Sequence, residues 1–415
     1  MKKLFRRGVV FSLAVIPALA ALNATAWANS HLEKWPTSKV NTTGLAVTDD
    51  TVTIGILHSI TGSMAISESG SVQAEKLAIK QINDAGGVLG RKIEWIQEDG
   101  ATDWPNFAEK AKKLIVNDKV AAVMGCWTSA SRKAVLPVFE QYNNMLYYPT
   151  MYEGLEASRN VVYTGQEATQ QILAGIDWVV AEKKPKTFYF VGSDYIWPRT
   201  SFKIARKHIE NVYNLKVIGE QYYPLGHTQF NSVINKMKLK KPDVIFSIVV
   251  GGSNVAFYKQ MTGAGVDLTK QTVITISATE DEVRGIGGEN IHGTYMFAKY
   301  FQSLDNPNNK KFVEEFKEMW GDDIVIGDVT NNAYLGPWLW KMAVEKAGSF
   351  DIDRIKEVNP GIEMANAPEG YVRIHETNHH LYSKLRVGRA RMDGQFDVVH
   401  ESELMEPDPF PEGYQ

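Results

Sequence analysis

The fold and the binding site are both indicated by one stretch, MGCWTSASRKAVLPVFEQYNNMLYYPTMYEG, residues 124–154. An apolar run at 120–124 ends at Gly125, and hydroxyl and aromatic residues follow before a helical pattern begins near Ser131. A second apolar run ends in the polar and aromatic residues 147–150. In a parallel α/β sheet, ligands bind beyond the carboxyl ends of the strands, where helix N-termini present free N–H groups. These two strand ends carry no nucleophile–base pair, so they indicate a pocket for a small polar molecule.

Strand and helix patterns alternate regularly from Thr51 onward. The first series comprises predicted strands at 52–59, 93–97 and 120–124 and predicted helices at 75–83, 107–116 and 132–142. The second series, after Gly165, comprises predicted strands at 187–191, 217–222, 244–250 and 273–276 and predicted helices at 169–181, 199–212, 230–237 and 254–261. Two consecutive βαβ series predict an α/β fold with two doubly wound lobes.

The last part of the chain departs from this alternation. It comprises a predicted strand at 294–301, predicted helices at 310–320 and 331–347, and a predicted hairpin of strands at 385–391 and 396–400. We expect these elements to be divided between the lobes, so that several strands cross the hinge. The predicted domains are a signal peptide (1–28), an N-terminal tether (29–50), an N-terminal lobe (51–165 plus about 299–365) and a C-terminal lobe (166–298 plus about 366–415). Two lobes that close on a crevice are typical of solute receptors.

The start of the chain predicts export. Four basic residues in the first seven precede an uncharged, mostly apolar run at 8–22, and Ala26-Trp27-Ala28 offers a cleavage site. The alternative is an N-terminal membrane anchor, but the run is shorter than the ~20 residues that span a bilayer. The sole cysteine, Cys126, lies deep in the chain, so no lipid-attachment cysteine follows the signal. We therefore expect an exported protein without a lipid anchor, most simply in a bacterial periplasm.

The charge and composition restrict the classes of partner. The formal net charge is −3, and it becomes more negative when the basic signal peptide is removed. A mildly acidic surface argues against nucleic acid or an anionic membrane as partner. Apolar residues make up 44% of the 415 residues, which is enough for two cored domains.

Five segments carry a resemblance to a known family: GCWTSASRKAVLPVFE (125–140), YYPTMYEG (147–154), VGSDYIWPR (191–199), SATEDE (277–282) and RARMDGQFDVV (389–399). The chain resembles the urea-binding and short-chain-amide-binding receptors of ABC transporters, within the branched-chain-amino-acid-type periplasmic binding proteins. The resemblance covers essentially all of the mature chain. It implies a type I periplasmic binding protein fold, with two lobes and three hinge strands, that delivers a solute to a membrane permease and needs no cofactor.

Nine residues are predicted to line the ligand site: Trp127, Thr128, Ser129, Tyr148, Thr150, Asp194, Tyr195, Thr279 and Glu280. Urea and small amides are neutral and planar, with N–H donors around one carbonyl. Their site therefore needs hydrogen-bond acceptors, at least one donor, and walls that exclude water. The resemblance implies that Tyr148, Thr150 and Tyr195 face the ligand, as their equivalents do in the amide-binding relatives.

Each of the other predicted site residues has a purely structural alternative. Trp127 can be a packing residue at a strand end, and Thr128 and Ser129 can simply cap the following helix. Asp194 can cap the helix after Trp197-Pro198. The acidic cluster at 279–282 can be a solvated first helical turn, where carboxylates suit the helix dipole.

Urea is the predicted solute, and other ligands and functions remain open. Thr150 follows the amide-receptor pattern, which leaves acetamide or formamide as alternatives, together with a periplasmic amide sensor and, less favoured, a branched-chain amino acid receptor. An amidohydrolase would need a nucleophile, a base and an oxyanion site in register, and no such set is legible. His379-His380 lacks neighbours with metal-ligand spacing, and Cys126 lacks a nearby histidine. We therefore expect neither catalytic residues nor a metal site.

Overall fold

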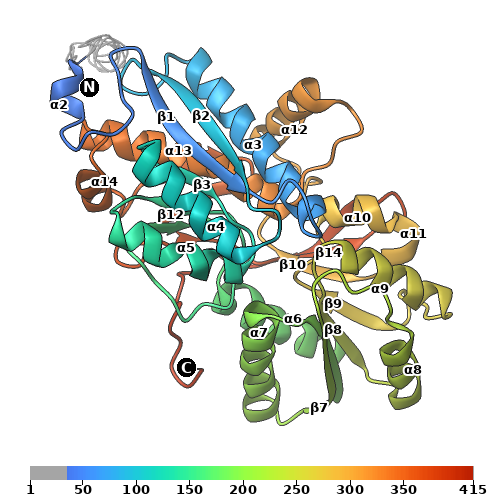
Figure 1. Ribbon diagram of the computed structural model, residues 1–415. Coiled ribbons are helices and arrows are strands. Elements are labelled where there is room, and N and C mark those ends of the chain that lie inside the picture. The colour runs from blue at the N-terminus through green and yellow to red at the C-terminus, as the bar shows by residue number, and fades with distance from the viewer. Residues whose placement is uncertain (1–34, 415) are drawn as a thin grey trace, which may run out of the picture.

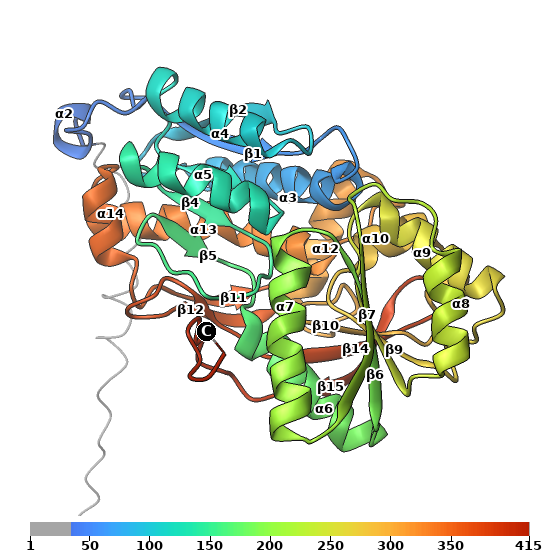
Figure 2. The same ribbon diagram turned by 60° about the horizontal axis from the view of Figure 1, so that its bottom comes forward.

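The protein consists of two α/β lobes, each built on its own sheet (Figures 1 and 2). The structure is a computed structural model, and it describes residues 35–414. The predicted signal peptide and the first residues of the predicted tether, 29–34, lie outside the described residues. The predicted fold class, two doubly wound lobes joined by a multi-strand hinge, is confirmed.

The N-terminal lobe is built on a five-stranded parallel sheet with the spatial order β2-β1-β3-β4-β5. Its strands are β1 (Thr51–His58), β2 (Lys92–Asp99), β3 (Val123–Gly125), β4 (Leu146–Tyr148) and β5 (Val161–Tyr163). Its helices are α2 (Thr37–Val40), α3 (Ala65–Asp84), α4 (Trp104–Lys112), η1 (Lys113–Asn117), α5 (Ser129–Gln141), α12 (Pro307–Trp320), α13 (Asp328–Ala347) and α14 (Ile352–Val358). The helices α3 and α13 cover one face of the sheet and α4 and α5 the other. Burial on both faces explains why β1 is almost continuously apolar.

The C-terminal lobe is built on a seven-stranded sheet with the order β15-β14-β10-β9-β8-β6-β7. Its strands are β6 (Thr187–Ser193), β7 (Lys216–Tyr223), β8 (Val244–Ile248), β9 (Thr272–Thr275), β10 (Tyr295–Ala298), β14 (Arg386–Ala390) and β15 (Phe396–Glu401). Its helices are η2 (Thr169–Leu173), α6 (Ala174–Lys183), α7 (Ile196–Lys207), η3 (His208–Val212), α8 (Asn231–Lys240), α9 (Gly252–Gly263), α10 (Glu280–Ile286) and α11 (Gly288–Ile291). The hairpin of β14 and β15 pairs antiparallel, and β14 continues the sheet beside β10.

The described chain passes between the lobes three times, at 164–168, 299–306 and 383–385. The third passage differs from the boundary near 366 that the sequence suggested. Strands β11 (Glu363–Ala367), β12 (Gly370–Ile374) and β13 (Leu381–Tyr382) form a small antiparallel sheet. A bridge between Tyr163 and His380 holds this sheet beside β5. We therefore assign residues 363–382 to the N-terminal lobe.

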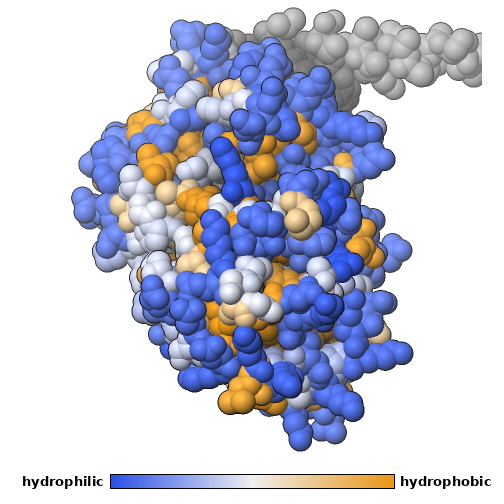
Figure 3. Space-filling view, turned by 90° about the vertical axis from the view of Figure 1, so that its right-hand side faces the viewer, coloured by the Kyte–Doolittle hydropathy of each residue, from blue (hydrophilic) through white to orange (hydrophobic). Residues whose placement is uncertain are grey.

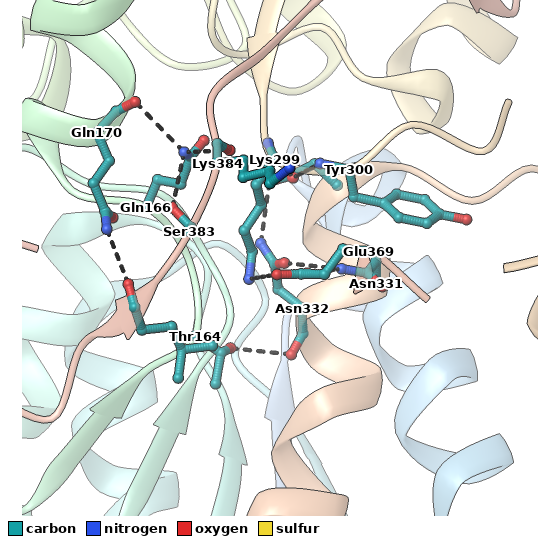
Figure 4. Close-up of polar contacts among 12 residues, drawn as sticks. Thr164, Gln166, Gln170, Lys299, Tyr300, Asn331, Asn332, Glu369, Ser383 and Lys384 are labelled. Carbon is teal, nitrogen blue, oxygen red and sulfur yellow. Dashed lines mark hydrogen bonds and ion pairs between the residues drawn. The ribbon is translucent and has the colours of Figure 1, made fainter. Parts of the chain in front are cut away.

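Buried polar contacts tie the hinge passages together (Figure 4). Lys299 Nζ lies 3.0 Å from Glu369 Oε1, and the two side chains are 1% and 4% exposed. Asn331 donates to the other carboxylate oxygen of Glu369 at 2.5 Å. Gln166, in the first passage, donates to Ser383 Oγ in the third at 3.1 Å. Removing one partner of a buried ion pair is strongly destabilising, so this network fixes the register of the hinge segments.

The segment from 35 to 50 packs on the N-terminal lobe and is not the loose tether that the sequence suggested. Asp351 Oδ1 accepts hydrogen bonds from Thr42 N at 2.8 Å and from Thr43 Oγ1 at 3.0 Å. Arg91, which is 0% exposed, donates to Trp35 O at 2.7 Å. These bonds order the segment because they satisfy groups that would otherwise be buried without a partner.

The last described residues, 402–414, form a C-terminal segment that contacts both lobes. Pro409 O accepts a hydrogen bond from Leu155 N, in the N-terminal lobe, at 2.7 Å. The hydroxyl of Tyr414 lies 2.6 Å from Nδ1 of His208, in the C-terminal lobe. The chain thus leaves the C-terminal lobe at the end of β15, touches the other lobe and returns.

No helix within residues 35–414 is long and apolar enough to cross a membrane. On the face seen in Figure 3, the surface is mostly hydrophilic and its hydrophobic side chains lie in separate patches.

Candidate functional site

The predicted site residues of the N-terminal lobe lie at the carboxyl ends of adjacent strands. Trp127 follows β3, and Tyr148 ends β4, which pairs with β3. Gly125 allows β3 to approach β1 closely, because a Cβ atom there would lie 2.2 Å from Leu57 O and its φ is +156°. Tyr195 stands opposite at the start of α7. The strand–helix junctions of the two lobes therefore face each other across the site.

The two lobes touch in this structure, which is a closed conformation. Gly252 N, in the C-terminal lobe, donates to Ser63 O, in the N-terminal lobe, at 3.0 Å. At Gly251 the φ is +59° and a Cβ atom would lie 2.5 Å from Ser63 O, so this approach requires glycine. Met64 is fully buried and packs into the core of the C-terminal lobe.

Aromatic side chains from both lobes form the walls. Trp127 meets Trp197 edge-on, with ring centroids 5.8 Å apart and an interplanar angle of 83°. Tyr195 lies 6.5 Å from Trp197 and 6.4 Å from Trp104, which begins α4. Edge-to-face and tilted pairs at these distances are favourable, so the rings hold the lobes together as well as excluding water.

A buried polar cluster lies at the base of the aromatic walls. Ser129 donates to Glu153 Oε2 at 2.6 Å. Arg132 donates to Glu153 Oε1 and to Ser129 Oγ, each at 3.2 Å, and its Nε donates to Glu156 Oε1 at 2.8 Å. Arg132 and Glu153 are 0% and 2% exposed. Burial disfavours the charged guanidinium, but Glu153, Tyr148 and Glu156 together outweigh burial and raise the pKa of Arg132 well above its ordinary value.

Tyr148 and Thr128 stabilise the local structure of the site. The Tyr148 hydroxyl donates to Trp127 O at 2.6 Å, and the guanidinium of Arg132 lies 4.9 Å from the centre of the Tyr148 ring. Thr128 Oγ1 accepts from Ser131 N at 3.0 Å and so caps α5. Thr128 therefore fits the capping alternative, and the oxygen of Tyr148 keeps a lone pair that can accept another bond.

Several buried polar atoms of this region have no hydrogen-bond partner within the described chain: Trp127 Nε1, Thr150 Oγ1, Tyr195 OH, Trp104 Nε1 and Trp197 Nε1. Buried polar groups are normally paired, so such a concentration calls for an explanation. Burial, together with Tyr148 and Glu153, raises the pKa of Tyr195 well above its ordinary value, so its hydroxyl is a neutral donor and acceptor. Three of these atoms belong to residues predicted from the sequence to line the ligand site, Trp127, Thr150 and Tyr195, and that role stays a prediction.

The structure does not bring Asp194 to this cluster. Its side chain is 41% exposed, and Oδ1 pairs with Arg199 Nε at 2.6 Å. Its backbone N–H donates to Tyr223 O, which turns the residue outward at the end of β6. An exposed carboxylate with a neighbouring cation is well solvated and has no need of a ligand.

Thr279 and Glu280 contact structural groups. Thr279 N and Oγ1 donate to Glu282 Oε2 at 2.9 and 2.8 Å, which forms a capping box at the start of α10. Glu280 is 1% exposed, and its Oε1 accepts from Gln302 N at 2.9 Å in the second hinge passage. Burial raises the pKa of Glu280 well above its ordinary value. Glu280 is buried, its Oε1 bonds to the hinge, and its Oε2 has no hydrogen-bond partner within the described chain. Its role at the ligand site stays a prediction.

A groove of about 920 Å³ lies elsewhere, between α3, α12 and α13 of the N-terminal lobe. Its walls include Leu77, Phe312, Tyr334 and Trp338. None of the predicted site residues, which all belong to the described chain, lines this groove.

The histidine pair and the cysteine have structural environments. His380 stacks on Tyr163 with ring centroids 4.1 Å apart, and burial lowers its pKa to about 3. Burial also lowers the pKa of His379 to about 4 and raises that of Cys126. Residues 35–414 contain no group of three or more His, Cys, Asp or Glu side chains that could hold a metal ion.

The sequence reasoning did not select four residues of this site: Arg132, Glu153, Trp104 and Trp197. Arg132 and Glu153 belong to two of the five segments that carry the resemblance, 125–140 and 147–154, and an unlike charge pair behind adjacent strand ends was the available signal. Trp197 is two residues from Tyr195, on the same first turn of α7. Trp104 had no signal beyond its position at a helix start.

The chain matches the family described as "Periplasmic binding protein domain" over residues 52–415. It is 26% identical over 318 residues to the leucine-, isoleucine-, valine-, threonine-, and alanine-binding protein of Pseudomonas aeruginosa, covering 74% of this chain and 82% of that protein. A shorter stretch of 118 residues is 38% identical to a limonene hydroxylase of Geobacillus stearothermophilus. That match covers 28% of this chain, and the chain spans only 21% of that protein.

A solved structure with the same fold is the solute binding protein of an ABC transporter from Rhodopseudomonas palustris, in complex with 3,4-dihydroxybenzoic acid. The TM-score is 0.76 at 24% identity, covering 86% of this chain and 98% of that chain. This likeness shows the fold, and the family match over nearly the whole described chain shows the class of the protein. The chain belongs to the periplasmic binding protein family, whose members are substrate-binding receptors of ABC transport and not enzymes.

Proposed function

We propose that this receptor binds urea between its lobes and delivers it to the permease of an ABC transporter. The observation that supports a neutral solute most directly is the pairing of Arg132. This buried guanidinium already binds Glu153 and Glu156. A ligand carboxylate would have to displace one of these partners, because a buried charge needs a partner of its own. The names of the relatives mention amino acids and a dihydroxybenzoic acid, which carry carboxylates, so the proposal separates this receptor from them.

The polar groups of the site suit a small solute rich in N–H groups. Trp127 Nε1, Thr150 Oγ1 and Tyr195 OH have no partner among residues 35–414 and offer donors for a carbonyl oxygen. The oxygens of Ser129, Thr150 and Tyr195 can accept N–H bonds from the same solute. Urea presents one carbonyl and four N–H bonds in a plane, and this set matches both requirements.

The aromatic walls support a small solute. Trp127 and Trp197 are in contact, and Tyr195 packs between Trp197 and Trp104. A leucine-sized side chain between these rings would force the lobes apart, and overpacking of this kind is unfavourable. A planar solute of four heavy atoms needs little separation.

The proposal is tested by isothermal titration calorimetry of the purified protein with urea, formamide, acetamide, leucine and benzoate. We expect urea to bind most tightly, and leucine and benzoate not to bind. Tighter binding of acetamide than urea would make the protein an amide receptor, which Thr150 favours as the alternative. If only leucine binds, the proposal is rejected and the protein is an amino acid receptor.

Transport requires a second experiment, because a periplasmic sensor would also bind the solute. Uptake of radiolabelled urea is compared in cells with and without the protein. Loss of uptake without the protein supports delivery to a permease, whereas unchanged uptake with retained binding indicates a sensor.

A further inference from the structure

A buried histidine between two glutamates lies beside the proposed site. His58 ends β1, and Glu68 and Glu75 project from α3. His58 Nε2 lies 2.8 Å from Glu75 Oε1, and Nδ1 lies 3.5 Å from Glu68 Oε2. His58 is 0% exposed, and both glutamates are 1% exposed. Ser59 N donates to Glu68 Oε2 at 2.6 Å, which anchors the carboxylate at the end of β1.

This arrangement places an imidazole between two buried carboxyl groups inside the lobe. Burial disfavours the protonated imidazole, but Glu75 and Glu68 outweigh burial and raise the pKa of His58 to about 9. At neutral pH one cation therefore lies between two carboxyl groups. Burial raises the pKa of Glu75, and His58 opposes that rise, so His58 and Glu75 form the tighter pair. Glu68 therefore interacts with the imidazolium of His58 more weakly than Glu75 does.

Glu68 lies at the carboxyl edge of the N-terminal sheet, because its carboxylate accepts from Ser59 N directly after β1, and Cys126 N, directly after β3, donates to Leu57 O at 2.8 Å. Burial is the main cause of the high pKa values of Tyr195 and Cys126, and the negative charge of Glu68 contributes to both. Cys126 directly precedes Trp127, and Tyr195 belongs to the opposite lobe. Ser63, just before α3, touches the C-terminal lobe through Gly252, and Glu68 lies in the first turn of that helix. Glu68 therefore lies where the two lobes meet.

An independent observation points to a ligand at this position. Tyr195 is 6% exposed, its hydroxyl has no partner within the described chain, and its pKa responds to Glu153 as well as to Glu68. These two carboxylates come from different segments of the N-terminal lobe, Glu68 from the first turn of α3 and Glu153 from the loop after β4. Trp127 Nε1, which also lacks a partner, belongs to the same wall.

We propose that Glu68 is a specificity-determining residue that accepts N–H bonds from the solute, and that His58, held by Glu75, is the positioning residue that keeps Glu68 in place. The inference rests on the proposed binding of a urea-like solute between the lobes. The solute class it names is neutral or cationic, planar and rich in N–H groups, so guanidinium should bind as well as urea. A carboxylate solute would place its oxygens against the oxygens of Glu68, which cannot donate to them.

The test compares Glu68→Gln with Asp84→Asn, which makes the same acid-to-amide change at the exposed far end of α3. Calorimetry with urea and with guanidinium chloride gives the dissociation constants at pH 7. Glu68→Gln should weaken urea binding roughly tenfold or more, the usual effect of losing a hydrogen bond to a charged group, and guanidinium binding further. Asp84→Asn should leave both constants unchanged. Glu68→Asp, which keeps the charge on a shorter side chain, guards against misfolding of the first variant.

The role of His58 is tested by the pH profile of urea binding. The titratable groups around His58 are Glu68 and Glu75 from α3 and Cys126 from the end of β3, and Lys76 and Tyr195 lie close to the same group. Wild-type affinity should fall as the pH rises through about 9, because deprotonation of His58 leaves the two carboxylates without their cation. His58→Gln should bind urea about three- to tenfold more weakly at pH 7 and lose this pH step, since the amide cannot titrate.

The possible outcomes separate the two proposals. If wild type binds none of these solutes, the proposed function fails, and this inference fails with it. If wild type binds urea and Glu68→Gln binds it equally well, only the role of Glu68 is rejected. If His58→Gln keeps the wild-type pH step, His58 is not the positioning residue.

Discussion

Trp127 of the N-terminal lobe meets Trp197 of the C-terminal lobe edge-on, with centroids 5.8 Å apart. Both rings are almost fully buried, although each is attached at the edge of its own lobe. Their burial therefore depends on closure, because an open receptor would expose the two indoles to water. The contact makes closure visible to a spectroscopic probe.

Ligand binding should change the tryptophan fluorescence of the wild-type protein. Closure moves the indoles of Trp127 and Trp197 from water into an apolar environment, and we expect a shift of the emission to shorter wavelength on titration with urea. Trp127→Phe should lose most of the shift, whereas Trp338→Phe, in the groove of the N-terminal lobe, should keep it. A wild-type spectrum that does not change at saturating urea, while calorimetry reports binding, would contradict the assignment of Trp127 as a wall of the site.

Thr150→Val should weaken urea binding about two- to tenfold, the usual effect of losing one neutral hydrogen bond. The substitution preserves the shape of the side chain and removes Oγ1, which has no protein partner. Acetamide should lose less affinity than urea, because its methyl group tolerates an apolar neighbour. Competition titrations with the two solutes measure the ratio, and an equal loss for both would place Thr150 away from the second nitrogen of urea.

Glu153→Gln should destabilise the fold by about 3 kcal/mol, the usual effect of breaking a buried ion pair. Its carboxylate is the partner of Ser129 and of the fully buried Arg132. Asp194→Asn is the matched control, because Asp194 is exposed and its pair with Arg199 should contribute no more than about 1 kcal/mol. Thermal unfolding measures both. Asp194→Asn should also leave urea affinity unchanged, and a clear loss would return Asp194 to the site.

His58 should make the stability of the protein decline in alkaline solution. Its folded-state pKa of about 9 lies above the ordinary value of 6.5, so its contribution is complete below about pH 6.5 and is lost as the pH rises through about 9. A shift of this size corresponds to at most about 3 kcal/mol. Thermal unfolding from pH 6 to 10 is the suitable measurement, since urea and guanidinium are proposed ligands.

Other buried groups also make stability depend on pH, so a control is needed. Burial raises the pKa of Asp281 to about 8 and that of Asp328 to about 6. Carboxyl groups with raised pKa values lose stability as the pH rises toward those values. Both carboxyl groups are present in wild type and in His58→Gln, so their effect cancels in the difference between the two unfolding temperatures at each pH. If that difference does not vary with pH, His58 is not an imidazolium in the folded protein.

The strand ends of the site were predictable because apolar runs mark parallel strands and ligands bind beyond their carboxyl ends. This rule is enough to bring together Trp127, Ser129 and Tyr148, whose strands are neighbours in the sheet. The second lobe follows the same rule for Tyr195. What the rule does not give is the direction of each side chain. Asp194 and Tyr195 are adjacent in sequence, yet one is exposed and the other is buried.

Contacts between distant segments were beyond the reach of the sequence. The pairing of Arg132 with Glu153 depends on how α5 lies against the loop after β4, and no local pattern encodes that position. The strands of the small sheet, 363–382, are short, and one has a bulge, so their alternation was too weak to recognise. Because these strands were not recognised, the third hinge passage was predicted near residue 366, whereas it lies at 383–385. Glu280 was expected near the ligand, but the bond to Gln302 depends on the path of the hinge.

The C-terminal segment affects how this receptor could be engineered as a fluorescent biosensor. Pro409 is tied to Leu155 and Tyr414 to His208, so the chain end spans the two bodies that move apart when the solute leaves. A fluorophore attached near Tyr414 would therefore report opening from outside the solute site, without competing with the solute. Because these contacts join the two lobes, a bulky domain fused after Tyr414 would interfere with opening. A reporter domain is better placed on an exposed loop within one lobe.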